Sequence, residues 1–294
     1  MKCIILAGGL GSRLGPCTLS LSKQILPVYD KPMIYYSLSL ALLAGLREIL
    51  IISSPDHLPF YQKLFGNGQE FGLSFSYAQQ DSPRGIADAF ILGEDFLAGQ
   101  SVCLILGDNI FYGHGLTEIL QQAVQEVHDG ARIFGYAVPF PQEYGVLVFD
   151  KQGKVVGIEE KPKQPKSKYA VPGLYFFDKT VVERAKRLQP SSRGELEITE
   201  LNNSYIREGK LAVHLLGRGF AWFDTGNPDN LLDAANFIAS VERNQGIKIS
   251  CIEEIAFKNG WMSKEMLEMR CDKLKNSQYG QYLLSVLSES IASV

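Results

Sequence analysis

The sequence predicts an α/β fold: a Rossmann-like core on a mixed, mainly parallel sheet, with a β-rich insertion and a helical C-terminal tail. Three observations carry this prediction. Short apolar runs alternate with amphipathic segments through the first half, a β-rich stretch follows Pro139, and the pattern beyond Pro228 is mostly helical. Strands that are apolar throughout and alternate with helices are typical of a parallel sheet covered on both faces.

The first half of the chain supplies the elements of that core. Strands are expected at 2–7, 48–53, 73–78, 102–108 and 131–138. The segments between them have the apolar spacing of helices, at 32–45, 57–66, 85–97 and 115–127. Pro32 suits a first-turn position and Gly45 suits a helix end, which supports the bounds of the first helix.

The second half continues with strands before it becomes helical. Residues 144–162 predict two strands around a tight turn at 151–154, where Gly153 supplies the turn backbone. Two further strand-like runs, 169–178 and 211–224, flank a helical pattern at 195–209. The simplest interpretation is one α/β domain that carries a β-rich insertion and a helical tail.

Composition excludes several classes of partner. With 46% hydrophobic and 21% charged residues, the 294-residue chain has the composition of an ordinary soluble globular protein. The net charge of −3 gives no basic footprint for nucleic acid. No segment approaches the roughly 18 apolar residues that would span a membrane. Five dispersed cysteines without a Cys-x-x-Cys pair argue for reduced thiols and a cytoplasmic location.

The loop GGLGSRLGPCTLSLSKQILP, at 8–27, is the first candidate site. A dinucleotide fingerprint would need its third glycine one residue before Gly15. A Walker loop would need Gly-Lys-Ser/Thr directly after its glycines, and GSRL offers no lysine there. A tight strand-to-helix turn remains an alternative for a lone glycine cluster. Two cations favour phosphate instead, because glycine N–H groups can form an anion-binding nest while Arg13 offers a planar fork and Lys23 a mobile charge.

Several motifs together resemble one enzyme family. They are LAGGLGSRL, SKQILPVYDKPMIYY, LGDNIFYGH, YGVLVFD, EEKPKQPKS, RGELEIT, GRGFAWFDTG and YGQYLL. With these motifs in this order, the sequence resembles the sugar-nucleotide pyrophosphorylases, which are nucleotidyltransferases with a glycosyltransferase A-like core. Among them it resembles the glucose-1-phosphate thymidylyltransferases (dTDP-glucose pyrophosphorylases), and the resemblance covers nearly the whole chain.

The resemblance implies a reaction and a division of the chain. dTTP, with UTP as the alternative, would react with α-D-glucose 1-phosphate to give dTDP-glucose and pyrophosphate, with Mg²⁺, as the first step of deoxythymidine-sugar biosynthesis. A nucleotidyltransferase domain would span 1–240, with a nucleotide-binding part at about 1–138 and a sugar-phosphate-binding part at about 139–227. A helical segment at 241–294 would pack on the core or at subunit contacts.

The chemistry explains why cations matter here. The attacking sugar-phosphate oxygen is already anionic, so no general base is needed, and the enzyme must hold two repelling anions together. The resemblance gives Arg13, Lys23 and Lys161 as catalytic residues. The nucleotide would contact Gly8, Gly9, Gly11, Ser12, Arg13, Lys23, Gln80, Gly85 and Asp108, and the sugar phosphate Asn109, Tyr144, Gly145, Glu160, Lys161 and Val171.

Two carboxylates are the candidate Mg²⁺ ligands. Asp108 follows an apolar run and would emerge at the carboxyl edge of the sheet, where open α/β folds bind ligands. Asp224 follows a second strand-like run, and a turn or a helix cap is the alternative for both residues. By resemblance the pair binds Mg²⁺, with phosphate oxygens and waters completing an octahedral oxygen site.

Selection of the base is expected around Gln80. One glutamine amide can donate and accept, which matches the O4 and N3–H edge of thymine or uracil, although little separates these two bases. Gly85 would let the backbone approach the base. Three residues depart from the family pattern: Ser12 and Pro172 each replace a threonine, and Arg84 stands where an acid is common.

The resemblance also implies assembly and regulation. The family is commonly homotetrameric, with a second nucleotide site at subunit contacts that mediates feedback. Gly217, Arg218 and Glu254 are the candidate residues for such a regulatory site.

Overall fold

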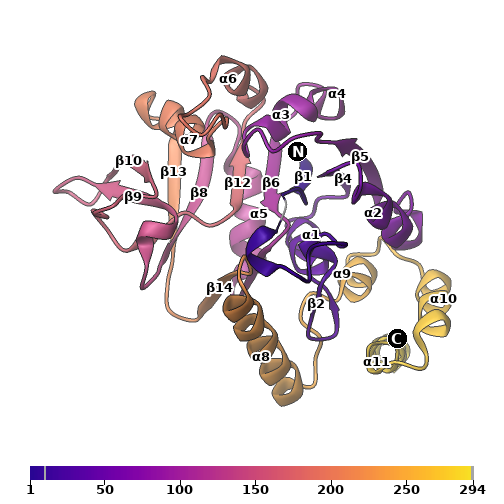
Figure 1. The fold of residues 1–294 in the computed structure, drawn as a ribbon. Coiled ribbons are helices and arrows are strands. Elements are labelled where there is room, and N and C mark those ends of the chain that lie inside the picture. Colours follow the sequence, from indigo (N-terminus) through magenta and orange to yellow (C-terminus); the bar gives the residue numbers. More distant parts are fainter. Residues whose placement is uncertain (10, 293–294) are drawn as a thin grey trace.

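The computed structural model describes residues 1–9 and 11–292, and one mixed sheet runs through the molecule (Figure 1). Its strands, in order across the sheet, are β10 (Val155–Glu160), β9 (Gly145–Phe149), β11 (Tyr169–Ala170), β8 (Ala131–Ala137), β12 (Leu174–Phe177), β6 (Val102–Leu106), β1 (Lys2–Leu6), β4 (Glu48–Ser53) and β5 (Ser74–Gln79). A further strand, β13 (Leu211–Leu216), pairs with β8. The predicted α/β fold with a mixed sheet is confirmed.

Parallel pairing is confined to part of this sheet. β6, β1, β4 and β5 are parallel neighbours, and so are β8 and β13. The remaining pairs, including the predicted hairpin of β9 and β10, are antiparallel. The β-rich stretch therefore extends the sheet of the core and does not form a separate layer. Parallel strands follow helical crossovers, whereas a tight turn returns the chain antiparallel.

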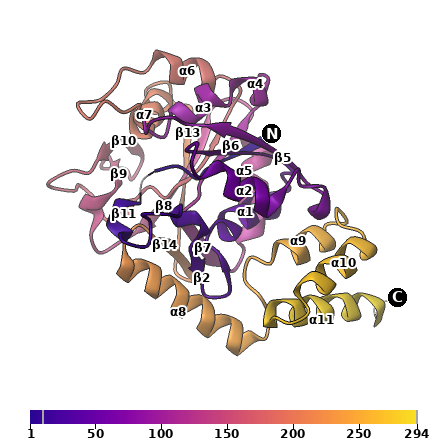
Figure 2. The ribbon, with the colours of Figure 1, turned by 45° about the vertical axis from the view of Figure 1, so that its right-hand side comes forward.

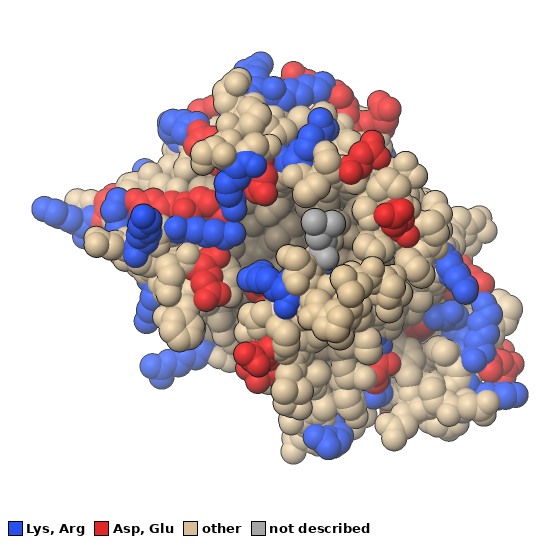
Figure 3. Space-filling view, viewed as in Figure 1, with Lys and Arg blue, Asp and Glu red and all other residues tan. Residues whose placement is uncertain are grey.

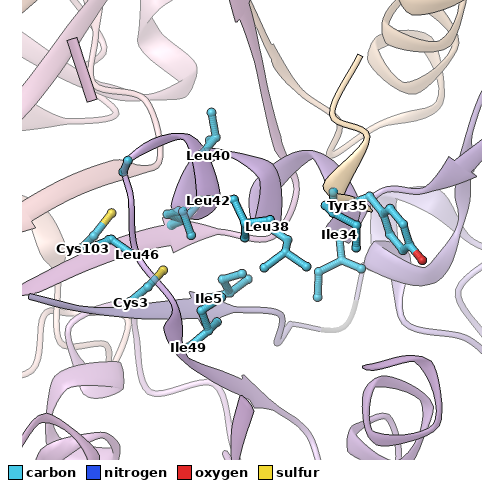
Figure 4. Close-up of a cluster of buried hydrophobic side chains, with 14 of the residues drawn as sticks. Cys3, Ile5, Ile34, Tyr35, Leu38, Leu40, Leu42, Leu46, Ile49 and Cys103 are labelled. Atoms are coloured by element: carbon cyan, nitrogen blue, oxygen red, sulfur yellow. The ribbon is translucent and has the colours of Figure 1, made fainter. Parts of the chain in front are cut away.

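Helices cover both faces of the sheet (Figures 1 and 2). On one face lie α1 (Ile34–Leu43), α2 (Leu58–Phe65) and α5 (Leu116–Glu126). On the other face lie α3 (Asp88–Leu92), α4 (Glu94–Leu97), α6 (Val181–Arg187) and α7 (Ile198–Arg207). Alternate strand residues supply the two cores, since Cys3 and Ile5 join the first and Ile4 the second. Figure 4 shows Cys3, Ile5 and Ile49 below Leu38 and Leu42 of α1, with Cys103 to their left.

The helix expected at 85–97 is two short helices. α3 and α4 are separated by Gly93, where a Cβ would lie 2.8 Å from Ile4 Cδ1. The close approach of this glycine to the sheet lets the chain change direction between the helices. The sequence pattern alone did not reveal this break.

The C-terminal part of the chain is helical, as predicted. It consists of α8 (Pro228–Gln245), α9 (Ile252–Lys258), α10 (Lys264–Leu274) and α11 (Gln278–Ala292). Asn227 caps α8, because its side chain accepts a hydrogen bond of 2.8 Å from Asn230 N. α8 continues across residue 240, so the expected boundary at 240–241 falls inside one helix. Among the described residues, no helix is long and apolar enough to cross a membrane.

Two small sheets complete the fold. β2 (Pro27–Val28) pairs with β3 (Lys31–Pro32), and β7 (Asn109–Gly113) pairs with β14 (Phe220–Asp224). No strand was expected at β7, which begins within the motif LGDNIFYGH. The antiparallel register places Asn109 opposite Asp224. Segments more than a hundred residues apart in the sequence thereby meet beside the end of β6.

The main sheet divides at one point, and this division creates room for a site. β11 and β12 belong to one run that pairs with β8 along one edge. Along its other edge, β12 pairs with β6 and β11 pairs with β9. Leu106 N donates to Gly173 O at 2.9 Å, and Val171 N donates to Gly145 O at 2.8 Å. The end of β6 and the start of β9 therefore part at 171–173, which we call the fork.

Candidate active site

Two adjoining cavities lie at the carboxyl end of β6. The loop cavity, of about 330 Å³, is lined by Gly8, Gly9, Gln80 and Gly85 among others. The fork cavity, of about 310 Å³, is lined by Tyr144, Gly145, Val171 and Asp224 among others. Each is in the size range of small-ligand sites. The two share the lining residues Ile86, Leu106, Asp108, Glu160, Lys161 and Ile198. Figure 3 shows the surface hollowed at the middle of this face, with Lys and Arg at the rim.

The glycine loop leaves β1 and borders the loop cavity. Gly9 and Gly11 have φ of 95° and 58°, in the left-handed region that glycine adopts without strain. Gly8 and Gly9 line the cavity, whereas Gly11 accepts a hydrogen bond of 2.8 Å from Thr18 Oγ1 and lies outside the lining. Ser12, at the start of a short 3₁₀ helix, is exposed and also lies outside.

Arg13 belongs to the fork cavity rather than to the loop cavity. It follows Ser12 in the 3₁₀ helix, and its guanidinium lies against Gly226, where a Cβ would be 2.5 Å from Arg13 Nη2. Burial raises the pKa of Asp224, and the positive charge of Arg13 opposes part of that rise. The structure thus separates Arg13 from Gly8 and Gly9, with which the sequence analysis had grouped it.

Lys23 forms an ion pair with Asp108, which lines both cavities, although Lys23 itself lines neither. Lys23 Nζ donates to Asp108 Oδ2, and the side chains are 12% and 16% exposed. Burial would raise the pKa of Asp108, but the charge and hydrogen bond of Lys23, with the amide of Asn109, lower it below its usual range. Asp108 is therefore ionised, and Lys23 is held by a carboxylate before any phosphate arrives.

Asp224 faces the same space from β14. Burial, followed by repulsion from Asp108, raises the pKa of Asp224 to about 6. Two carboxylates that share a site cannot both ionise cheaply unless a cation compensates them. Among the described residues, no group of three or more His, Cys, Asp and Glu is placed to hold a metal ion. A metal here would need ligands from phosphate or water.

Asn109 fixes the geometry around Asp108. Its side chain is buried: Oδ1 accepts from Gly173 N at 2.9 Å and from Trp222 Nε1 at 2.7 Å. Its Nδ2 donates to Asp108 Oδ1 at 2.9 Å. Because Oδ1 already accepts two hydrogen bonds, only the second proton of Nδ2 remains for a ligand. Asn109 thus connects Gly173 of the fork to Asp108 through hydrogen bonds. Its sequence context did not reveal this role.

The remaining candidates for the sugar phosphate come together at the fork. Lys161 N donates to Tyr144 O at 2.9 Å, and Lys161 itself has φ of 43°. Glu160 Oε2 accepts a 2.5 Å hydrogen bond from Thr199 Oγ1, which orients the carboxylate. Glu160 and Lys161 line both cavities, so they lie where two ligands would meet. Pro172 lies within the fork, between the lining residues Val171 and Gly173.

Gln80 and Gly85 also line the loop cavity. Gln80 is 8% exposed, and its Nε2 donates to Asp88 Oδ2 at 3.0 Å. Gly85 has φ of 98°, and a Cβ there would lie 2.4 Å from Leu196 O. The contact with Leu196 leaves no room for a side chain, so packing alone explains a glycine at this position. The sequence analysis had instead explained it by approach of the backbone to the base. Arg84 forms an ion pair with Asp88.

Sequence reasoning assigned no role to several residues of the site. Arg193 lines the loop cavity; its Nη2 is 2.9 Å from Glu197 Oε2 and 3.6 Å from Glu160 Oε1. Gln24, which is 1% exposed, accepts from Ser22 Oγ at 2.6 Å and also lines this cavity. Both belong to motifs that carried the resemblance, RGELEIT and SKQ. That motif membership was the available signal.

The three candidate regulatory residues lie on separate elements. Gly217 and Arg218 form the turn between β13 and β14, while Glu254 is on α9. Glu254 accepts hydrogen bonds from Lys258 Nζ at 2.6 Å and Tyr282 OH at 2.7 Å. Within the described part of the chain, no hydrogen bond or ion pair joins Glu254 to the turn. A regulatory site and a tetramer both remain predictions.

Comparisons with known proteins show the family to which this chain belongs. A family model described as nucleotidyl transferase matches residues 2–241, and the chain belongs to this family. A glucose-1-phosphate thymidylyltransferase of Neisseria meningitidis is 53% identical over 98% of this chain and 100% of that protein. One from Mycobacterium tuberculosis is 51% identical over 99% and 100%. This full-length identity places the chain among the glucose-1-phosphate thymidylyltransferases, and the resemblance drawn from the motifs is confirmed.

Solved structures show the same fold. A Bacillus anthracis protein assigned as a glucose-1-phosphate thymidylyltransferase, in complex with a sucrose, has a TM-score of 0.74 and 41% identity, covering 81% of this chain and 94% of that one. A UDP-glucose pyrophosphorylase complexed with UDP-glucose has a TM-score of 0.71 over 81% of this chain and 98% of that one. At 22% identity, the second comparison supports the fold alone.

Proposed function

We propose that this chain joins dTTP to α-D-glucose 1-phosphate and releases pyrophosphate, as its family membership indicates. The observation that carries the proposal is the junction of the two cavities, where Asp108 and Lys161 line both. A reaction between two phosphate-bearing substrates needs two subsites that share a charged boundary. The glycine loop and Gln80 favour the loop cavity for the nucleotide, and Tyr144 and Glu160 favour the fork cavity for the sugar phosphate.

In this reaction an oxygen of the sugar phosphate attacks the α-phosphorus of dTTP. A new P–O bond forms, the bond to the β-phosphate breaks, and pyrophosphate leaves with the electron pair. No proton needs to move, since the attacking oxygen is anionic. Catalysis then depends on alignment and on cations that compensate the crowded phosphate charge.

Four side chains can supply that compensation. Lys161 lies at the junction, Lys23 reaches it beside Asp108, Arg13 approaches from the fork cavity and Arg193 from the loop cavity. Arginine offers phosphate a planar guanidinium group that can donate two parallel hydrogen bonds, while lysine adds a mobile point charge. Arg193 and Lys23 already pair with carboxylates, so phosphate would exchange places with a protein anion. Such pairs hold the cations in position before substrate binds.

Asp108 and Asp224 are the residues that would hold Mg²⁺. The residues present fit this ion, because the raised pKa of Asp224 marks a site short of positive charge, and carboxylate oxygens are ligands that Mg²⁺ prefers. When bound, Mg²⁺ would supply charge neutralisation to the phosphate oxygens. Asn109 would support it by fixing Asp108 through its amide.

The test is pyrophosphate release with glucose 1-phosphate and Mg²⁺, measured in parallel with dTTP, UTP, CTP, ATP and GTP. Release with dTTP, equalled or followed by UTP and absent with the purine nucleotides, is the expected result. Release only with another nucleotide would overturn the assignment of the base. No release with any nucleotide would overturn the reaction, and binding of dTDP-glucose would then indicate a regulatory homologue.

A further inference from the structure

A buried carboxylate lies behind the proposed base-reading residue. Asp88, the first residue of α3, is 1% exposed and does not line the loop cavity itself. Its Oδ2 accepts a hydrogen bond of 3.0 Å from Gln80 Nε2, and its Oδ1 accepts one of 2.8 Å from Arg84 Nη2. The Arg84 side chain is 59% exposed. The exposed guanidinium of Arg84 therefore compensates the charge of the buried Asp88 carboxylate, which in turn contacts Gln80.

The chemistry of this contact fixes the orientation of an amide. A carboxylate paired with arginine only accepts hydrogen bonds, so Gln80 must turn its NH₂ group towards Asp88. The amide oxygen then points away from Asp88. It lies towards the glycine loop, 3.1 Å from the place that a Cβ of Gly8 would occupy. Among the described residues, Gln80 Oε1 accepts no hydrogen bond, so its acceptor capacity is available in the loop cavity.

We propose that Asp88 is a positioning residue that holds the Gln80 amide with its oxygen towards the base, and thereby selects thymine or uracil over cytosine. This inference rests on the proposed use of the loop cavity for the nucleotide. Thymine and uracil carry a donor at N3, which matches the oxygen of Gln80. Cytosine carries an acceptor at N3, which would face that oxygen without a proton between them.

Asp88 matters because a glutamine amide can otherwise rotate. A free amide could turn its NH₂ group towards N3 of cytosine and lose little. With Asp88 in place, the same rotation would set two oxygens against each other in a buried position. A site that leaves a buried polar group unpaired rejects the wrong ligand strongly. The carboxylate, and not the glutamine alone, then sets the selectivity.

The test compares dTTP with dCTP, because these nucleotides differ only in the base. The kcat/KM for each is measured for the wild-type enzyme and for Asp88→Asn, Gln80→Ala and Asp95→Asn. Asparagine at 88 keeps the size of the side chain and offers Gln80 either a donor or an acceptor. Asp95→Asn is the matched control, since Asp95 lies in the next short helix, α4, and is exposed.

We expect Asp88→Asn to lower the dTTP:dCTP ratio of kcat/KM at least about tenfold, chiefly by improving dCTP, while Asp95→Asn leaves it unchanged. Thermal unfolding of each variant reports whether the fold is kept. An equal loss for both nucleotides, or a ratio within twofold of wild type, would overturn the positioning role. A ratio that collapses in Gln80→Ala but persists in Asp88→Asn would also overturn it. Failure of the proposed function would appear separately, as a wild-type enzyme that does not use dTTP.

Discussion

Gly85 lies directly against the backbone of Leu196. A Cβ at Gly85 would be 2.4 Å from Leu196 O and 2.6 Å from Leu196 N. Two hydrogen bonds flank this contact, from Leu196 N to Arg84 O at 2.7 Å and from Ala87 N to Leu196 O at 3.2 Å. Segments from opposite halves of the chain, one carrying Gln80 and the other Arg193, are therefore joined beside the loop cavity.

Gly85→Ala should consequently destabilise the fold by more than its backbone angle alone would cost. With φ of 98°, the angle alone costs an alanine about 1–2 kcal/mol. The collision with Leu196 should bring the total to about 2–4 kcal/mol. Gly153→Ala is the matched control, since φ is 81° there and no atom lies within 4 Å of the added methyl group. Urea unfolding of both variants measures the difference, and equal losses would contradict the argument.

The central strands were predictable because they are apolar on both faces. Cys3, Ile4 and Ile5 are all fully buried, as a covered parallel strand requires. β7 was not predictable from its own residues, since it forms by pairing with β14, far along the chain. Strand formation of this kind depends on the partner more than on local preference. The same reason explains why the pairing of Asn109 with Asp224 was missed.

In the candidate site, too, the sequence identified the kinds of residue but not their positions relative to one another. Glycines, cations and carboxylates were identified singly, because their chemistry is visible in the motifs. Their neighbours were not, since the direction of a side chain depends on the local backbone. Arg13 turns from a 3₁₀ helix towards Gly226, and Asp88 had the appearance of an ordinary acid in a helical first turn. Tertiary contacts decide such details.

Arg13→Ala should reduce turnover by roughly 10²–10³, as loss of a preorganised charge at a reacting phosphate does. The guanidinium lines the fork cavity beside Asp224, so its removal acts on the reacting groups rather than on stability. Arg187→Ala is the control, because Arg187 is an exposed arginine of α6. Steady-state pyrophosphate release at saturating substrate measures both. A decrease in turnover of less than threefold for Arg13→Ala would show that Arg13 is not a catalytic residue.

Asp224→Asn should abolish most activity and yet stabilise the metal-free protein. The pKa of Asp224 in the fold is about 6, above the ordinary value of 3.8. The folded state therefore binds the proton more tightly than the unfolded state, and this contribution to stability is lost as pH rises through about 6. Asparagine imitates the neutral form. In EDTA at pH 7.5 we expect a gain of about 1–3 kcal/mol in the free energy of unfolding, which shrinks as the pH falls through about 6 and vanishes below the ordinary pKa of 3.8.

Mg²⁺ gives the complementary measurement. The wild-type protein should gain thermal stability when Mg²⁺ and a nucleotide are added, while Asp224→Asn should gain much less from the ion, because a bound ligand stabilises only the state that binds it. Asp229→Asn is the control, as Asp229 is exposed in the first turn of α8. An Asp224→Asn variant that keeps the full response to Mg²⁺ would show that the ion does not depend on this carboxylate.

The C-terminal helices depend on a buried ion pair. Glu253 of α9 is 0% exposed; Arg270 Nη2 of α10 lies 2.7 Å from its Oε1, and Tyr279 OH of α11 donates to its Oε2 at 2.6 Å. Removing one partner of such a pair leaves a buried charge uncompensated, at a cost of about 3–5 kcal/mol. Replacing both partners removes the need for compensation.

We therefore expect Arg270→Leu to destabilise the protein by about 3–5 kcal/mol, and the double variant Arg270→Leu with Glu253→Gln to be more stable than Arg270→Leu alone. Lys273→Leu serves as the control, because Lys273 pairs with Glu70 at an exposed position. Chemical unfolding of the wild type, Arg270→Leu, Glu253→Gln and the double variant gives the coupling energy between the two residues. If the losses of the single variants simply add in the double variant, the pair does not hold α9 to α10.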